Sequence, residues 1–367
     1  MKILHIISSS GFYGAEQVLL NLVSLLKEDG HKPYLICLKN RTKPDPQIHV
    51  QAQKQGISSK VVNCRHKLDL GAIKEIKQFV KQENIKIIHS HGYKSDFYGL
   101  IAAKLVRIPI VATLHLWTQE TARDRFYEWL DKRLIKRMNH LIPVSPLINN
   151  QLKALKIADN KVTLIPNGID VDKFNSARVN TNLRHRFGLN DDLVIGTVGR
   201  LAQQKGQTYL IKAFKELSGT KGLKLLIVGD GYLKESLHKE VKELGIENDV
   251  VFTGAQKDIE AAYNSMNIFV LPSINEGLPL ALLEAMSMGF AVIATKVGAI
   301  PYVMQDRAEG MLVSPGSIKE LKEAIFTLIK DSALRKQMGE KAREKVKSAF
   351  SLETFYQKYI EVYNRLS

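Results

Sequence analysis

Two glutamates, Glu276 and Glu284, frame the start of an expected helix in the stretch SINEGLPLALLEAMSMG. Pro279 suits the first turn of a helix, and Gly277 and Leu278 before it would leave free backbone N–H groups. Carboxylates before and inside such a helix can accept hydrogen bonds from the hydroxyls of a ribose or a hexose. The alternatives are an acid that suits the helix dipole at Glu276 and a solvated helix face at Glu284. The apolar residues around Glu284 disfavour the second alternative, because they would bury it.

A second group of candidate residues is cationic. Gly199 and Arg200 end the apolar run DLVIGTV, and Lys205 lies in the following loop before another helical pattern. Fixed cations in such a loop can clamp a diphosphate and neutralise the charge that grows on a departing phosphate. A glycine beside them lets a ligand approach the backbone closely. The alternative is a pair of solvated surface residues on a basic chain.

Histidines end two further apolar runs, His89 and His91 in IKIIHSHG and His115 in PIVATLH. A histidine at the carboxyl end of a parallel strand points toward the ligand crevice, although a lone histidine is more often structural. A metal site is possible in principle, but no Asp-x-Asp pair follows a strand, and fixed cations can replace a metal. Gly11 and Gly14 do not complete G-x-G-x-x-G, which disfavours a dinucleotide cofactor.

Alternating strands and helices must position these residues. Short apolar runs alternate with helical patterns along the chain, which is typical of βα units with buried parallel strands. In the first half we expect strands at MKILHII, PYLICL, KVVN, IKIIHSH, IPIVATLH, HLIPVS and KVTLIPN. The periodicity fails over residues 167–182, so we expect a linker there between two doubly wound α/β domains with a cleft between them. Three helical patterns close the chain, at 317–330, 332–348 and 352–366.

The charge of the chain, +16, is concentrated in its first half, where residues 1–175 hold 27 Lys and Arg against 15 Asp and Glu. This favours an anionic partner. Nucleic acid is disfavoured, because the basic residues lack the aromatic interleaving of an RNA-binding sheet. Two cysteines indicate a reducing compartment, and the short apolar runs predict neither a signal peptide nor a membrane span. We therefore expect a cytoplasmic protein, or one attached to the cytoplasmic face of a membrane.

Residues 118–139 are predicted to form an amphipathic helix. Its apolar face would combine Phe126, Trp129, Leu130, Leu134 and Met138, with basic side chains elsewhere. Such a helix can lie on an anionic lipid surface, which would suit a lipid-linked acceptor. The alternative is a helix that packs on its own domain with a solvated basic face.

Taken together, the motifs resemble the retaining GT-B glycosyltransferases of family 4. The resemblance runs over almost the whole chain and includes GFYGAEQVLLNLV, IIHSHGYKSDFYGLIAA, IPNGID, TVGRLAQQKGQTYLIKAF, VLPSINEGLPLALLEAMSMG and VIATKVGAIPYVM. It implies an α/β fold of GT-B architecture, with two Rossmann-like domains facing a central cleft. Residues 1–172 would form the acceptor-side domain, joined by a C-terminal helix at about 352–367 that crosses back, and 173–351 the nucleotide-sugar donor domain.

The same resemblance implies roles for the candidate residues. Arg200 and Lys205, beside Gly199, would hold the donor diphosphate, and Glu284 would bind the nucleotide ribose. Glu276 would contact the sugar, with the backbone of residues 277–279 against the sugar and phosphate. In the first domain, His115 matches a histidine near the transferred sugar, and Gly14 matches a loop glycine that approaches the phosphate or acceptor.

The implied activity is transfer of a sugar from a UDP-, GDP- or ADP-sugar to a glycan or lipid-linked acceptor, in cell-surface polysaccharide or lipopolysaccharide synthesis. The resemblance implies retention of configuration, no metal and no cofactor, with the leaving phosphate accepting the proton of the acceptor. Alternatives on the same scaffold are a nucleotide-sugar epimerase or phosphorylase and a non-catalytic sugar-binding subunit.

Overall fold

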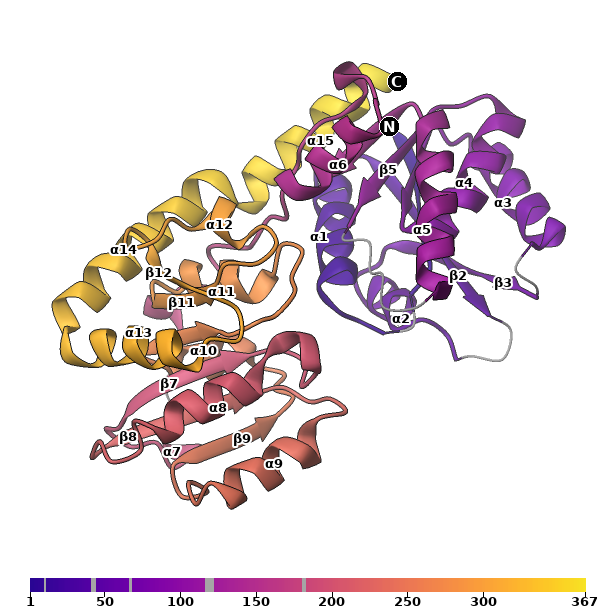
Figure 1. Cartoon of the computed structure of the whole chain (residues 1–367). Coiled ribbons are helices and arrows are strands. Elements are labelled where there is room, and N and C mark those ends of the chain that lie inside the picture. Colours follow the sequence, from indigo (N-terminus) through magenta and orange to yellow (C-terminus); the bar gives the residue numbers. More distant parts are fainter. Residues whose placement is uncertain (10, 41–43, 66–67, 116–121, 180–182) are drawn as a thin grey trace. The chain divides into compact units, whose positions relative to one another are not determined.

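The computed structural model describes the chain except for residues 10, 41–43, 66–67, 116–121 and 180–182. The chain folds as two compact units (Figure 1). Unit 1 comprises Met1–Gly168 and Glu353–Ser367, and unit 2 comprises Ile169–Leu352. Each unit has its own parallel sheet and its own hydrophobic core.

Unit 1 contains a six-stranded parallel sheet in the order β3-β2-β1-β4-β5-β6. Its strands are β1 (Lys2–Ile7), β2 (Lys32–Asn40), β3 (Ser58–Cys64), β4 (Ile87–His91), β5 (Ile110–Leu114) and β6 (His140–Pro143). Its helices are α1 (Gly14–Glu28), α2 (Gln47–Lys54), α3 (Leu70–Gln82), α4 (Tyr93–Val106), α5 (Ala122–Leu134), α6 (Pro146–Ala154) and α15 (Leu352–Leu366). The strand order reverses between β1 and β4, which is where doubly wound sheets bind ligands.

Unit 2 repeats this strand order, as β12-β11-β10-β7-β8-β9. The strands are β7 (Leu193–Val198), β8 (Leu223–Val228), β9 (Val250–Gly254), β10 (Ile268–Leu271), β11 (Ala291–Thr295) and β12 (Gly310–Val313). The helices are α7 (Leu183–Arg186), α8 (Gln207–Lys215), α9 (Lys234–Glu243), α10 (Ile259–Asn264), α11 (Leu280–Ser287), α12 (Ile300–Val303), α13 (Ile318–Lys330) and α14 (Ser332–Ala349). Here the order reverses between β7 and β10. The predicted α/β fold with two doubly wound sheets is confirmed.

One expected strand is absent from the sheets. Residues 161–167, KVTLIPN, form only an isolated bridge, between Val162 and Leu141. The backbone N–H groups of Thr163 and Ile165 donate to the carbonyls of Leu141 and Pro143, each at 3.1 Å. Pro143 at the end of β6 has no N–H to donate back to this segment, so the alternating hydrogen bonds of a parallel ladder cannot continue. The segment therefore runs beside β6 without forming a seventh strand.

The boundary between the units follows Gly168, near the start of the expected linker. Ile169 donates its N–H to Phe350 O at 2.8 Å and accepts from Leu352 N at 3.0 Å. Phe174 is buried in the core of unit 2. These contacts assign the segment that follows Gly168 to unit 2, because the N–H and the carbonyl of Ile169 are both bonded there and the Phe174 side chain is buried in its core.

The C-terminal helix α15 packs in unit 1, whereas α14 before it belongs to unit 2. The side chains of Phe355, Tyr359, Val362 and Tyr363 are buried along one face of α15, as the helical spacing predicts. Tyr356 at the edge of this face donates its hydroxyl to Asp29 Oδ2 at 2.6 Å. The apolar face and its hydroxyl groups together hold α15 in place.

Candidate functional site

The loops after β7 and β10 bring two predicted site residues of unit 2 into contact. Lys205 Nζ lies 2.6 Å from Glu276 Oε1, and Ser273 Oγ donates to the same carboxylate oxygen at 2.7 Å. The side chain of Glu276 is 7% exposed and that of Lys205 is 17% exposed. The pair is therefore a largely buried ion pair at the carboxyl edge of the sheet, where the strand order reverses.

Backbone contacts fix the loop that carries Glu276. Ile274 N donates to Gln204 O at 2.8 Å, and Ala299 N donates to Gly277 O at 2.9 Å. Two glycines make this close packing possible. Gly206 has φ +66°, and a Cβ there would lie 2.1 Å from Pro272 O; Gly298 has φ +57°, and a Cβ would lie 1.9 Å from Glu276 O. Any side chain at either position would displace the loop, so the backbone around Glu276 is rigidly held.

Glu284 lies in α11, which begins just after Pro279 and Leu278, and it has a hydroxyl partner from another helix. The hydroxyl of Tyr263 in α10 donates to Glu284 Oε2 at 2.7 Å. Burial raises the pKa of Glu284, whereas the Tyr263 hydrogen bond and the positive charges of Lys173 and Lys205 lower it. The interpretation of Glu284 as a solvated helix residue is therefore wrong, because its carboxylate is half-buried and hydrogen-bonded.

Gly199 and Arg200 follow β7 in the loop that leads to Lys205. Gly199 N donates to Val228 O at 3.0 Å, which ties this loop to the end of β8. The carbonyl of Arg200 accepts from Gln207 Nε2 at 3.0 Å, while its side chain is exposed. The backbone of this loop is thus anchored, and the Arg200 side chain lies at the surface of unit 2, in the loop that leads to Lys205.

The remaining predicted site residues, Gly14 and His115, belong to unit 1. Gly14 is the first residue of α1, after Tyr13, whose N–H donates to Glu16 Oε2 at 2.9 Å. His115 directly follows β5 and is half-buried. Burial lowers the pKa of His115, and the nearby charge of Glu16 opposes this shift. Both residues therefore follow strands of unit 1 at their carboxyl ends.

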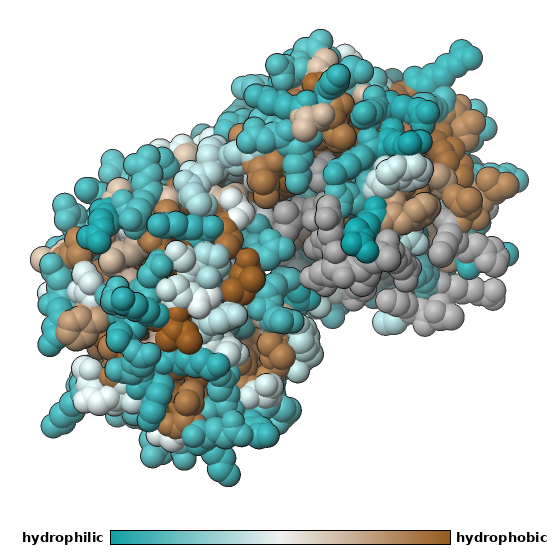
Figure 2. Space-filling model, in the orientation of Figure 1, coloured by the Kyte–Doolittle hydropathy of each residue, from teal (hydrophilic) through white to brown (hydrophobic). Residues whose placement is uncertain are grey.

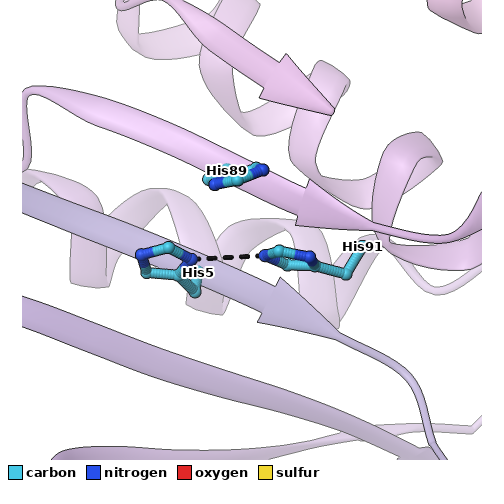
Figure 3. A group of neighbouring side chains, drawn as sticks. All are labelled: His5, His89 and His91. Carbon is cyan, nitrogen blue, oxygen red and sulfur yellow. Dashed lines mark hydrogen bonds between the residues drawn. The ribbon is translucent and has the colours of Figure 1, made fainter. Parts of the chain in front are cut away.

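The histidines of β1 and β4 form a cluster (Figure 3). In the described part of the chain, His5, His89 and His91 are the one group of three potential metal-ligating side chains, with ligand atoms within 4.8 Å of one another. Both ring nitrogens of His89 are hydrogen-bonded, Nδ1 to Tyr363 OH at 2.6 Å and Nε2 to Thr113 Oγ1 at 2.8 Å. A metal would require His89 to give up one of these bonds. His89 instead connects α15 to β4 and β5.

Several residues of these networks were not predicted from the sequence. They are Ser273, Tyr263 and Gly298 in unit 2 and His5 and Glu16 in unit 1. Ser273 and Gly298 stand inside motifs already noted, so their positions in loops after strands were a usable signal. The hydrogen bond between Tyr263 and Glu284 joins two helices, and no residue spacing within either helix predicts it.

In the described part of residues 118–139, the helix α5 ends at Leu134, so Met138 lies beyond it, and the predicted apolar face is divided between exposed and buried side chains. Phe126 and Trp129 are 58% and 49% exposed, whereas Met138 is buried. The acids Glu128 and Asp131 are buried instead. Packing of α5 against α4 decides which side chains face inward, and it places aromatic rings outside. Residues 118–121 of the predicted helix lie outside the described residues.

Among the described residues, the helices are too short or too polar for any to cross a membrane. Figure 2 shows a largely hydrophilic surface on this side of the molecule, with hydrophobic side chains in scattered patches.

Two family models match the chain. The model described as Glycosyltransferase Family 4 matches residues 12–173, and the model described as Glycosyl transferases group 1 matches residues 179–345. Among curated relatives, the UDP-Gal:alpha-D-GlcNAc-diphosphoundecaprenol alpha-1,3-galactosyltransferase of Escherichia coli is 26% identical, over 99% of this chain and 96% of the relative. The capsular polysaccharide biosynthesis glycosyltransferase CapM of Staphylococcus aureus is 29% identical, over 81% of this chain and 83% of the relative.

Solved structures share the fold. Anabaena HepE in complex with UDP superposes with a TM-score of 0.89 and 23% identity, over 100% of both chains. The apo form of the lipopolysaccharide outer core galactosyltransferase WaaB has a TM-score of 0.76 and 21% identity, also over 100% of both chains. At these identities the likeness shows the GT-B fold.

Proposed function

This chain belongs to the glycosyltransferases of group 1 and family 4, and we propose that it moves a sugar from a nucleotide diphosphate sugar to a glycan or lipid-linked acceptor. The observation that carries this proposal is the buried pair of Lys205 and Glu276 beside the N-terminus of α11. An ammonium group has three N–H donors, so Lys205 can keep its bond to Glu276 and still bind a phosphate oxygen. Glu276 can then accept from a sugar hydroxyl beside that phosphate.

The donor would lie along the carboxyl edge of unit 2. Lys205 and Arg200 would hold the diphosphate, with the backbone of Gly199 and of residues 277–279 close to it. Glu284 would accept hydrogen bonds from the ribose hydroxyls. The Tyr263 hydrogen bond supports this role, because it favours the ionised form of a carboxylate that burial disfavours.

We propose that transfer retains the anomeric configuration and needs no metal. The acceptor oxygen forms a bond to the anomeric carbon while the bond from that carbon to the phosphate oxygen breaks. The proton of the acceptor hydroxyl passes to the leaving phosphate, and Lys205 and Arg200 stabilise the charge that grows there. Gly14 and His115 of unit 1 would serve the transferred sugar and acceptor side of the reaction.

The proposed donors are UDP-, GDP- and ADP-sugars, of which UDP-sugars are the first to test. The name of the Escherichia coli relative includes UDP-Gal, and the HepE structure contains UDP. The names of the relatives also support a place in capsular polysaccharide or lipopolysaccharide synthesis, with a lipid-linked acceptor.

A donor panel tests this function. The protein would be screened with each nucleotide sugar by thermal shift and by slow hydrolysis of the donor in the absence of acceptor. We expect one nucleotide class to raise the melting temperature and to be hydrolysed. Retention is then read from the anomeric proton of the product by NMR, and metal independence from activity in excess EDTA. If no donor stabilises the protein or is turned over, the proposal fails.

We also propose that α5 rests on the cytoplasmic face of an anionic membrane. Phe126 and Trp129 lie outside, with ring centroids 5.9 Å apart, and the Arg133 guanidinium lies 4.0 Å from the Trp129 ring centroid. The acids Glu128 and Asp131 face inward, so they do not repel anionic headgroups. Exposed aromatic and basic side chains together suit the membrane interface.

Vesicle flotation tests this partner with a matched control. Trp129→Ala is expected to reduce salt-sensitive binding to vesicles that contain anionic lipid, with little binding to zwitterionic vesicles in either case. The control is Phe326→Ala in α13, because Phe326 is also 49% exposed and has Lys330 Nζ 5.5 Å from its ring centroid. Equal losses in the two variants, or no binding by the unmodified protein, would remove the membrane from the proposal.

A further inference from the structure

His91 is the member of the histidine cluster that reaches the ligand edge of unit 1. It is the last residue of β4, pairs in register with Ile7 of β1 and is 8% exposed, whereas His5 and His89 are fully buried. Figure 3 shows His91 at the tip of its strand and His5 on the neighbouring strand. In doubly wound sheets ligands bind beyond the carboxyl ends of the two strands where the order reverses, and β1 and β4 are those strands.

A single hydrogen bond connects His5 to His91. His5 Nδ1 lies 3.2 Å from His91 Nε2. Burial lowers the pKa of His5 to about 3 and holds the pKa of His91 well below its usual value, so both rings are neutral near pH 7. Two neutral imidazoles share one proton in such a bond, and either ring can be the donor. The second nitrogen of His5 decides which ring donates.

His5 Nε2 is buried and has no hydrogen-bond partner among the described residues. A proton on this nitrogen would leave a buried N–H donor without an acceptor, which is the more costly arrangement. A proton on Nδ1 leaves only an unshared lone pair at Nε2. His5 therefore donates from Nδ1 to His91 Nε2, and the neutral ring of His91 must carry its own proton on Nδ1.

We propose that His91 donates its Nδ1–H to a hydroxyl oxygen of the sugar acceptor, and that His5 is the positioning residue that fixes this proton. The inference rests on the proposed glycosyl transfer and identifies the side chain that binds the acceptor sugar. A neutral donor suits a neutral hydroxyl, whereas a phosphate would be better served by the cations found in unit 2. Glu16, in the first turn of α1, and His115 after β5 add polar groups around the same edge of the sheet.

This arrangement has a consequence for the proton of the acceptor. Because His91 Nδ1 already carries a proton, it has no lone pair with which to take the proton of the acceptor hydroxyl. In the proposed transfer the hydroxyl proton leaves with the phosphate oxygen of the broken bond, so His91 need not accept it. His91 is thus a binding residue for the nucleophile rather than its base.

The position of the proton is measurable without any substrate. Ring nitrogen NMR of histidine-labelled protein, with His91 assigned by loss of its signals in His91→Asn, is expected to show a proton on Nδ1. His5→Asn keeps a donor near the place of Nδ1 and should preserve this tautomer, whereas His5→Leu removes the donor and should release it. A proton on His91 Nε2 in the unmodified protein, or no change in His5→Leu, would overturn the role of His5. His238→Gln, an exposed histidine of α9, is the control.

Methyl glycosides are the hydroxyl probe for the site. A panel of the gluco, galacto and N-acetylglucosamine forms at millimolar concentration should shift the His91 Nδ1 signal and leave that of His238 unchanged. With the glycoside accepted best, His91→Ala should lower transfer about tenfold to hundredfold, and His91→Asn should retain more activity. UDP binding should be unchanged in both variants. No shift with any glycoside overturns the acceptor subsite, whereas a shift without donor binding would refute only the proposed transfer.

Discussion

The two sheets have the same strand order, but the side chains at the point where that order reverses are charged in unit 2 and neutral in unit 1. In unit 2 the residues that meet there are charged, Lys205 after β7 and Glu276 after β10, 2.6 Å apart. In unit 1 they are the neutral pair of His5 on β1 and His91 on β4, 3.2 Å apart. The same strand order thus carries a charged pair in unit 2 and a neutral pair in unit 1, because side chains at the ends of strands can change without altering the sheet.

The largest expected difference between the two units is in how their stability changes with acid. Burial lowers the pKa of His5 to about 3 and of His140 to about 4, so below pH about 6.5 these histidines bind protons in unfolded unit 1 but not in folded unit 1, whereas the raised pKa of buried Asp96 acts in the opposite direction. The contribution of these histidines to the stability of unit 1 is therefore fully present above that pH and decreases as the pH drops toward 4. In unit 2, burial raises the pKa of Glu284, so that carboxyl favours the folded state more as the pH falls.

Tryptophan fluorescence measures this difference, because both tryptophans of the sequence fall within the range 1–168 that the first part of unit 1 spans. We expect the denaturant concentration at the midpoint of unfolding to be lower at pH 4 than at pH 7. This decrease should be larger when unfolding is followed by fluorescence than when it is followed by circular dichroism. A fluorescence midpoint that does not change with pH would contradict the neutral state assigned to the buried histidines.

Removal of the charge in unit 2 should have the next largest effect. Lys205→Ala is expected to lower donor turnover about 100-fold to 1,000-fold, because it removes a cation from the departing phosphate and leaves Glu276 buried without its partner. Steady-state hydrolysis of the donor identified by the panel is the measurement. Lys224→Ala, which breaks the ion pair of Lys224 with Asp249 at 2.8 Å near the opposite end of the sheet, is the control and should retain most activity. Similar losses in the two variants would contradict a specific role.

A smaller effect is expected from Tyr263→Phe. The variant removes the hydroxyl that donates to Glu284 and so raises the pKa of that carboxyl further. If ionised Glu284 binds the ribose, the acid limb of the pH profile of kcat/KM should move to higher pH. An unchanged acid limb together with normal nucleotide affinity would remove Glu284 from the ribose site.

The smallest effect concerns the attachment of α15. Tyr363→Phe removes a buried hydrogen bond to His89 and should lower the free energy of unfolding of unit 1 by about 1 kcal/mol. Donor binding in unit 2 should not change. Chemical denaturation followed by tryptophan fluorescence gives the value, and the control is Tyr302→Phe, at a tyrosine of unit 2 that is 45% exposed. An equal effect of both substitutions would argue against the Tyr363 bond as a stabilising contact.

The sequence predicted most of the fold because its signals are local. Buried parallel strands appear as apolar runs, and Val18, Leu22 and Leu26 of α1 are buried as their helical spacing predicts. The same reasoning failed for residues 161–167, where Pro143 of the neighbouring strand interrupts the ladder. For α5 it predicted a helix but not its end at Leu134, and amphipathicity could not tell which side chains a neighbouring helix covers.

By itself, the sequence determined the alternation of strands and helices, the loops that carry Lys205 and Glu276, and the strand end that carries His91. These properties depend on spacing and backbone preference over a few residues. Only the tertiary structure decided that Lys205 meets Glu276, that Tyr263 serves Glu284 and that His5 lies behind His91. Each of these contacts joins segments brought together by strand order, and a hydrogen bond or ion pair forms only when its two atoms lie within about 3 Å of each other.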